Sequence, residues 1–215
     1  MSAHESLRQS CITNGLDESD VVANPIDQFD RWFSEMKENV PGDWFEANAM
    51  TLATSSSTGH VTARVVLLKI YDQEGFVFFT NYDSEKGNQL AENPQAALCL
   101  HWPFLQRQIR IEGAVTQVSE ELSDSYFQSR PRGSQIGAVA SGQSQPLSSR
   151  AELAERAKEV EAEFAGQQVP RPKNWGGYRV SPSKIEFWQG RENRLHDRLV
   201  YTQEADGWSL RRTSP

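Results

Sequence analysis

Basic side chains alternate in the segment RENRLHDR, residues 191–198. In an extended strand, residues two apart share a face, so the spacing predicts that Arg194, His196 and Arg198 point to one side. Like charges on one face repel each other unless an anion lies against them. The segment therefore predicts a binding surface for an anionic ligand.

Two further stretches carry donors that suit phosphate. The stretch SEKG, residues 84–87, opens a helix whose free backbone N–H groups and dipole favour an anion, and Lys86 adds positive charge. The stretch YFQSRPRGSQIGA carries arginine and hydroxyl donors at Tyr126, Arg130, Arg132 and Ser134. Taken alone, each stretch also fits a structural role. SEKG fits the start of a capped surface helix, and YFQSRPRGSQIGA fits a helix C-terminus where cations interact with the dipole. Taken together, the separate clusters indicate two phosphate-bearing ligands.

Other polar stretches have plain structural alternatives. In RVVLLK, Arg64 and Lys69 are predicted to point to opposite faces of a barrel strand, whose charged ends keep it soluble. Gln143 and Ser144 in GQSQ fit an ordinary loop, and Trp188 in EFWQG fits the core. Their assignment to a site depends on the rest of the sequence.

The composition sets these basic clusters against an acidic background. The chain has 215 residues and a net charge of −7, so we expect its surface to repel nucleic acid and anionic membranes. No dinucleotide fingerprint, phosphate-binding loop or zinc motif is present, and the four histidines are scattered, which predicts no metal site. Because the side chains alone supply no redox or nucleophilic centre, one of the two ligands is predicted to be a cofactor.

The N-terminal residues and the cysteines indicate the compartment. The stretch MSAHESLRQS lacks the apolar centre of a secretory signal, and the apolar run at residues 96–105 is too short to cross a bilayer. Cys11 and Cys99 offer neither a metal spacing nor a disulfide framework. We therefore expect a cytoplasmic protein with no membrane segment.

The periodicity of apolar residues predicts a mainly β fold with interspersed helices. A flexible segment is expected over residues 1–23 and a single domain over residues 24–215. Helices are predicted after the capping residues Asn24, Ser84, Ser119 and Ser149, the last in a capping box with Glu152, and a short helical stretch at 135–140. Strands are predicted at 49–81 (three strands), 95–102, 107–118 and 176–212, with a hairpin turn at 205–207. Such strands favour a closed or split β-barrel with peripheral helices.

Eight stretches in order along the chain resemble the pyridoxamine (pyridoxine) 5′-phosphate oxidase family. They are RVVLLK, FFTNYDSEKG, RQIRIEG, YFQSRPRGSQIGA, QS, WGGYRV, EFWQG and RLHDR. The resemblance implies an FMN-binding split β-barrel with peripheral helices (α+β) that acts as a homodimer with FMN at the subunit interface. It also implies oxidation of pyridoxine or pyridoxamine 5′-phosphate to pyridoxal 5′-phosphate in vitamin B6 synthesis, with O₂ as acceptor and H₂O₂ as product.

The resemblance assigns residues to two ligands. The implied FMN contacts are Arg64, Val65, Val66, Leu67, Leu68, Lys69, Phe79, Thr80, Lys86, Gln108, Gln143, Ser144, Trp188 and Arg198. Arg64, Lys86 and Ser144 would hold the FMN phosphate. The implied substrate contacts are Lys69, Tyr126, Arg130, Ser134, Arg194, Leu195, His196 and Arg8.

The same resemblance implies roles for the basic segment near the C-terminus. Arg198 would stabilise the anionic reduced flavin, which makes hydride acceptance easier. Arg194 and His196, the implied catalytic residues, would position the substrate C4′ over flavin N5, where geometry supplies much of the rate. His196 could also carry a proton.

Two features depart from the family pattern. Glu85 stands where a basic residue is usual, so it is expected either to weaken FMN binding or to point into solvent. The segment around Cys11 matches only loosely. Two alternatives stay open on these grounds: a related split-barrel flavin oxidase of phenazine biosynthesis, and a non-catalytic protein that binds FMN or pyridoxal phosphate.

Overall fold

The computed structural model describes residues 15–215, which form two compact units. The first unit combines the described residues up to Thr51 with Ala97–Glu112 and Pro182–Pro215. The second unit combines Leu52–Ala96 with Gly113–Ser181. None of the helices in residues 15–215 has both the length and the apolar character needed to cross a membrane.

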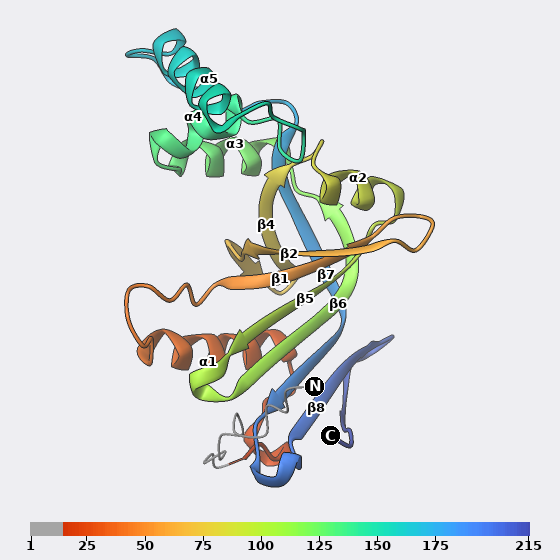
Figure 1. Cartoon of the computed structure of the whole chain (residues 1–215). Coiled ribbons are helices and arrows are strands. Elements are labelled where there is room, and N and C mark those ends of the chain that lie inside the picture. The colour runs from red at the N-terminus through yellow and green to blue at the C-terminus, as the bar shows by residue number, and fades with distance from the viewer. Residues whose placement is uncertain (1–14) are drawn as a thin grey trace, which may run out of the picture. The chain divides into compact units, whose positions relative to one another are not determined.

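Antiparallel strands dominate the fold, with helices between them (Figure 1). The strands are β1 Ala49–Ser55, β2 Val61–Leu67, β3 Ile70–Asp72, β4 Gly75–Asn81, β5 Gln95–Trp102, β6 Arg107–Gln117, β7 Trp175–Gln189, β8 Asp197–Glu204 and β9 Gly207–Arg212. The helices are α1 Pro25–Glu38, α2 Glu85–Glu92, α3 Glu120–Ser129, α4 Arg132–Ala140 and α5 Arg150–Glu163, with short 3₁₀ turns η2 Glu18–Asp20, η3 Pro103–Leu105 and η4 Glu192–Arg194. The sheet order is β2-β1-β5-β6-β7-β4-β3, and β8 pairs with β7 and β9.

Helix α1 belongs to the first unit and begins where the sequence predicts. The Asn24 side chain accepts hydrogen bonds from the first backbone N–H groups of the helix, and Pro25 occupies the first helical position. The apolar stripe of α1 is buried, and the Trp32 ring packs edge-on against Phe187 with 5.2 Å between centroids. This packing fixes α1 against the end of β7 that lies in the same unit.

The described part of the segment predicted to be flexible is held in place in the first unit. Leu16 is buried, and its backbone N–H donates to Asp197 over 3.0 Å. Arg212 of β9 forms ion pairs with Asp17 and Glu18. Residues 15–23 therefore have partners in β8 and β9, while residues 1–14 lie outside the described structure.

Helices α3, α4 and α5 lie close together near the ends of β4 and β7 in the second unit (Figure 1). Their shared core contains buried Phe127, Ile136, Val169 and Trp175. Ala157 and Val160 of α5, together with Phe164 just after it, pack against this cluster. The core anchors the helix pair α3 and α4 beside strand β4.

Three local predictions need correction. The run 49–81 forms four strands, because the chain breaks at Leu68 and Lys69 between β2 and β3. The capping box of α5 is shifted, since Ser149 accepts from the Glu152 N–H but the Glu152 carboxylate accepts from Ser148. Helix α4 starts at Arg132, earlier than the predicted stretch at 135–140.

Candidate active site

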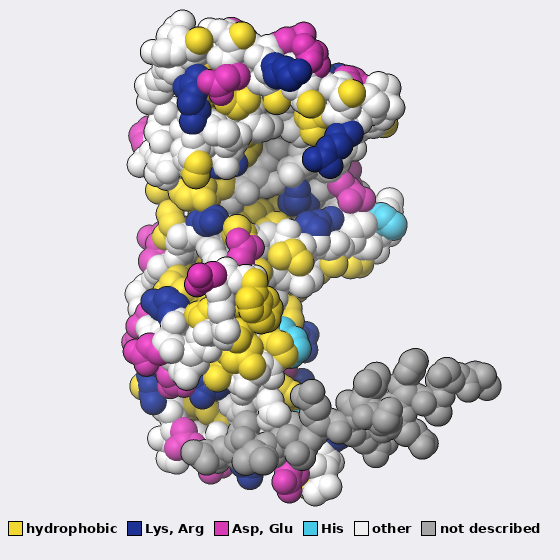
Figure 2. Space-filling view, turned by 60° about the vertical axis from the view of Figure 1, so that its left-hand side comes forward, with side chains coloured by type: hydrophobic (Ala, Val, Ile, Leu, Met, Phe, Trp, Pro, Cys, Tyr) yellow, Lys and Arg dark blue, Asp and Glu magenta, His cyan; other side chains and the backbone are white. Residues whose placement is uncertain are grey.

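A cavity of about 890 Å³ lies in the second unit. The residues that line it include Arg64, Val65, Val66, Leu67, Lys69, Phe79, Thr80, Glu85, Lys86, Tyr126, Arg130, Ser134, Gln143, Ser144 and Trp175. Figure 2 shows a hollow in its upper half with dark blue Lys and Arg side chains at its edge, next to an acidic one. The volume is in the range of cofactor and small-molecule sites.

Arg64 lies on β2 with its guanidinium held by neutral oxygens. It donates to Thr54 Oγ1 over 2.6 Å and to the Leu52 carbonyl over 3.4 Å, and it also donates to Thr62. Burial lowers the pKa of Arg64, and the nearby Glu85 carboxylate opposes that shift. The arginine stays charged, and its fork geometry suits a phosphate group.

Lys86 lies in the first turn of α2, where Ser84 caps the helix. Its Nζ contacts Thr80 Oγ1 at 3.1 Å, Ser84 Oγ at 3.1 Å and Gln143 Oε1 at 3.2 Å. Burial, together with the charge of Arg64, lowers the pKa of Lys86 to about 8. An anion placed at these two cations would relieve both the burial cost and the repulsion.

The loop after α4 meets the start of α2. The backbone N–H of Glu85 donates to Ser144 Oγ over 3.3 Å, and Thr80 Oγ1 donates to Gln143 Oε1 over 3.0 Å. A helix N-terminus, a hydroxyl and two cations therefore converge at one end of the cavity. We refer to Arg64, Lys86, Ser144 and the first turn of α2 as the α2 anion site.

Arg130 follows α3 elsewhere on the cavity wall. Its Nη1 is buried with no hydrogen-bond partner among the described residues, and its guanidinium lies 4.7 Å from the Trp175 ring centroid. Burial lowers the pKa of Arg130. A buried donor without an acceptor is costly, so this arginine is poised for an anion.

An aromatic stack lies next to Arg130. Tyr126 stacks on Phe79 with 3.9 Å between centroids, and Trp175 is nearly parallel to Tyr126 at 6.2 Å. All three line the cavity, where Tyr126 and Phe79 are half-buried and Trp175 is buried. Sequence reasoning missed Trp175, although it begins the WGGYRV stretch.

The cavity also corrects the prediction for RVVLLK. Arg64 and Lys69 both line it, whereas an unbroken strand would turn them to opposite faces. The alternation stops because β2 ends at Leu67 and the Lys69 N–H bonds to the Val77 carbonyl over 2.9 Å. Leu68, an expected FMN contact, is buried and is not part of the cavity wall.

The remaining expected site residues belong to the first unit. They are Gln108, Trp188, Arg194, Leu195, His196 and Arg198. The His196 ring lies 4.6 Å from the Trp188 ring, and its Nδ1 accepts from the Arg191 N–H over 3.0 Å. Arg198 pairs with the buried Glu186 carboxylate over 2.6 Å and donates to the Ser214 carbonyl. Gln108 is half-buried on β6, and Arg8 lies outside the described residues.

The alternating basic face predicted for residues 191–198 is wrong. Residues Glu192–Arg194 form a 3₁₀ turn, with φ of 55° at Asn193 and 63° at Arg194. The strand begins only at Asp197, so Arg194 and His196 precede it and only Arg198 lies within it. Arg194 and Leu195 are exposed at the turn.

Two family models together match most of the chain. Residues 35–164 match the model described as pyridoxamine 5′-phosphate oxidase. Residues 175–215 match the model described as the pyridoxine 5′-phosphate oxidase C-terminal dimerisation region, which indicates a homodimer.

Curated relatives are similar over nearly their whole length. A pyridoxine/pyridoxamine 5′-phosphate oxidase of Rhodopirellula baltica is 48% identical, covering 99% of this chain and 97% of the relative. A protein of the same name from Paraburkholderia phymatum is 52% identical, covering 100% of this chain and 100% of the relative. Another from Rubrobacter xylanophilus is also 52% identical, covering 97% of this chain and 95% of the relative.

Solved structures share the fold, and with the sequence relatives they fix the family. PhzG from Burkholderia lata 383, solved with tetrahydrophenazine-1-carboxylic acid, has a TM-score of 0.86 and 30% identity, covering 94% of this chain and 98% of that chain. A pyridoxamine 5′-phosphate oxidase-related, FMN-binding protein from Nostoc punctiforme has a TM-score of 0.67 and 16% identity. The match covers 87% of this chain and 95% of that chain. The predicted split β-barrel with peripheral helices is confirmed. The chain belongs to the pyridoxamine 5′-phosphate oxidase family.

Proposed function

We propose that the protein is an FMN-dependent oxidase that converts pyridoxine or pyridoxamine 5′-phosphate to pyridoxal 5′-phosphate, with O₂ as the electron acceptor. The observation that carries this proposal is one cavity with two groups of side chains that can donate hydrogen bonds to a phosphate. They are the α2 anion site and the group Tyr126, Arg130 and Ser134. Two phosphorylated ligands in contact are what a flavin enzyme acting on a phosphorylated vitamin requires.

The residues present fit FMN. The α2 anion site offers a guanidinium, an ammonium, a hydroxyl and backbone N–H groups, the donor set that a phosphate monoester takes. Burial and the charge of Arg64 lower the pKa of Lys86, so a phosphate at this site would stabilise the charged lysine. The β2 segment from Val65 to Leu67 lines the same cavity and would lie along the flavin.

The residues near Arg130 fit the phosphate of the substrate. Arg130 offers its buried, unpartnered Nη1, and Ser134 and Lys69 also line the cavity. Cation–π contact with Trp175 and Phe127 holds the guanidinium in one orientation. The stacked Tyr126 and Phe79 rings would keep water from one side of the pyridine ring.

The first unit would supply the residues that orient the substrate. Because His196 Nδ1 accepts a hydrogen bond, the neutral ring carries its proton on Nε2, which can donate to a ligand. The ion pair with the buried Glu186 carboxylate holds the Arg198 guanidinium in place. We propose that FMN lies at the interface of a homodimer. Bound FMN supplies the two-electron acceptor, and O₂ accepts its electrons to give H₂O₂.

Oxygen uptake tests this proposal directly. Purified protein with FMN is expected to consume O₂ and form pyridoxal 5′-phosphate when given pyridoxine or pyridoxamine 5′-phosphate. Unphosphorylated pyridoxine should react far more slowly, because Arg130 would lose its partner. FMN binding without any O₂ uptake on either phosphorylated vitamer would instead identify a non-catalytic binding protein.

The likeness to PhzG supports a second candidate, a flavin oxidase acting on a reduced phenazine. A phenazine carboxylate also offers an anion to the buried donor of Arg130, so this arginine alone does not separate the two substrates. The higher identity to relatives named pyridoxine/pyridoxamine 5′-phosphate oxidase, 48–52% against 30% for PhzG, favours the phosphorylated vitamer. Parallel assays with both substrates decide between them. Turnover of a reduced phenazine without turnover of the phosphorylated vitamers would establish the second candidate.

The lowered pKa of Lys86 predicts how cofactor binding depends on pH. The free protein loses the Lys86 charge as the pH rises through about 8, whereas a bound phosphate would keep the lysine charged. Binding then takes up a proton, so FMN affinity should fall above pH 8, by up to about tenfold per pH unit.

Fluorescence titration with FMN from pH 7 to 9.5 measures this effect. The variant Lys86→Arg remains charged throughout this range and should give a flatter profile. An affinity of the unmodified protein that does not change with pH would show that Lys86 does not contact the phosphate.

A further inference from the structure

Glu85 introduces a negative charge into the α2 anion site. It is the single acidic side chain among the described residues that line the cavity. Its Oε2 lies 3.6 Å from Arg64 Nη2. That guanidinium also donates to neutral oxygens of Leu52, Thr54 and Thr62. The Glu85 carboxylate therefore lies next to Arg64, the cation that a phosphate bound at this site would need.

The pair is loose enough to be exchanged. A direct bond between a guanidinium and a carboxylate is about 2.7–2.9 Å long, shorter than the distance between Glu85 and Arg64. The Glu85 side chain is 55% exposed and that of Arg64 is 19% exposed. An entering phosphate can therefore replace Glu85 as the partner of Arg64. The arginine stays where it is, and the exposed carboxylate turns outward into water.

The position of Glu85 gives its charge a second effect. It is the first residue of α2, where a negative side chain interacts favourably with the helix dipole. A phosphate at the same helix end would use that same dipole, together with Arg64 and Lys86. The carboxylate and the phosphate thus compete for every positive element of the α2 anion site.

We propose that Glu85 is an internal counter-ion that competes with the FMN phosphate for Arg64 and so sets the affinity of the protein for its cofactor. This inference rests on the proposed function, because it takes FMN as the ligand of the α2 anion site. In the absence of FMN the carboxylate partly neutralises the two cations. When FMN binds, the carboxylate must leave Arg64 or remain beside a like charge, and both reduce the net gain from binding.

Substitution of Glu85 tests the competition. Glu85→Gln is expected to bind FMN roughly threefold to tenfold more tightly than the unmodified protein at low ionic strength, and Glu85→Ala should show the same gain. The gain should shrink as salt is added, because the charges are partly exposed. Fluorescence titration of the full-length, flavin-free chain gives both dissociation constants.

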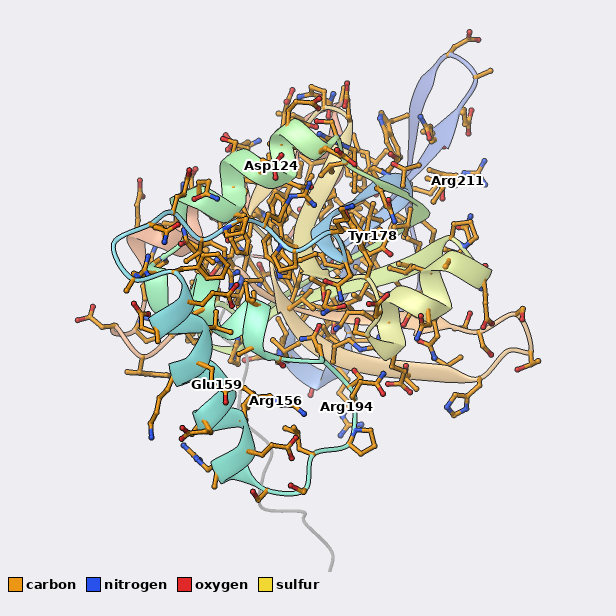
Figure 3. The ribbon with its side chains drawn as sticks, turned by 90° about the horizontal axis from the view of Figure 1, so that it is seen from above. Asp124, Arg156, Glu159, Tyr178, Arg194 and Arg211 are labelled. Carbon is orange, nitrogen blue, oxygen red and sulfur yellow. The ribbon has the colours of Figure 1, made fainter. Side chains whose placement is uncertain are left out.

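Two controls separate charge at the site from charge in general. Glu159 lies on α5, where Figure 3 shows it away from α2, and it does not line the cavity. Glu159→Gln makes the same change in net charge and should leave FMN affinity as it is. Riboflavin has no phosphate, so Glu85→Gln should not tighten its binding.

The outcomes distinguish this inference from the function on which it rests. Equal FMN affinity of the unmodified protein and both Glu85 variants at low salt would overturn the role of Glu85 and leave the oxidase proposal intact. Equal tightening of FMN and riboflavin would also overturn it, since the effect would not involve the phosphate. Failure of the unmodified protein and all variants to bind FMN would overturn the proposed function itself.

Discussion

Replacing Arg64 with alanine is expected to weaken FMN binding by about 1.5–3 kcal/mol, or roughly 10- to 150-fold. The arginine lies at the α2 anion site, and a charge-assisted pair of hydrogen bonds to phosphate would be lost. Turnover at saturating FMN should change much less, because Arg64 is on the cofactor side of the cavity. Equilibrium titration with FMN and steady-state kinetics at high FMN measure the two effects separately.

Loss of Arg64 also removes contacts within the protein, so a control for stability is needed. Arg179 of β7 is similarly shielded in the same unit, where it forms an ion pair with Asp72. Arg179→Ala should lower the free energy of unfolding without weakening FMN binding. If Arg64→Ala retained FMN as well as the unmodified protein did, the α2 anion site would not be the phosphate site.

Replacing Arg194 with alanine is expected to have the opposite pattern. The catalytic efficiency, kcat/KM, for pyridoxine 5′-phosphate should fall on the order of 100-fold, because the substrate would lose a group that orients it. FMN affinity should stay close to that of the unmodified protein. Arg194 is exposed in the turn before β8, so the free energy of unfolding should change by no more than about 0.5 kcal/mol.

Arg211 provides a matched control for this substitution. It is an exposed arginine on β9 of the same unit, and Figure 3 labels both residues. Arg211→Ala removes the same charge and should leave turnover unchanged. Unaltered kcat and KM in Arg194→Ala would remove Arg194 from the active site and leave the assignment of the cavity in the second unit untouched.

Local signals predicted the helix starts well. Asn24, Ser84 and Ser119 each accept a backbone hydrogen bond from the helix that they precede. Capping depends on residues within one turn of each other, so the sequence contains all the information needed. The assignment of Lys86 to an anion site followed from such a signal, and the structure places it beside Arg64.

Predictions from residue periodicity failed where a regular strand ended or a turn interrupted an extended segment. No glycine or proline marks the end of β2 at Leu67, so Arg64 and Lys69 were predicted on opposite faces although both line the cavity. The turn at Asn193 and Arg194 uses left-handed backbone without glycine. Asparagine tolerates that conformation, but arginine gives no such signal, so an extended segment was predicted instead.

Long-range contacts could not be predicted from spacing at all. The pair between Arg198 and buried Glu186 joins neighbouring strands whose register depends on the whole sheet. Trp175 was indistinguishable from a core aromatic residue until its stack with Tyr126 and its contact with Arg130 were seen. The resemblance to a family identified many of these residues but could not reveal the ion pair of Glu85 with Arg64.

The visible absorbance of the FMN-loaded protein during anaerobic addition of pyridoxine 5′-phosphate tests the central claim most directly. If the cavity holds FMN beside a phosphorylated vitamer, the absorbance of the oxidised flavin should disappear on mixing and return when O₂ is admitted, with pyridoxal 5′-phosphate formed in equal amount. A flavin spectrum that stays oxidised with either phosphorylated vitamer would contradict the account.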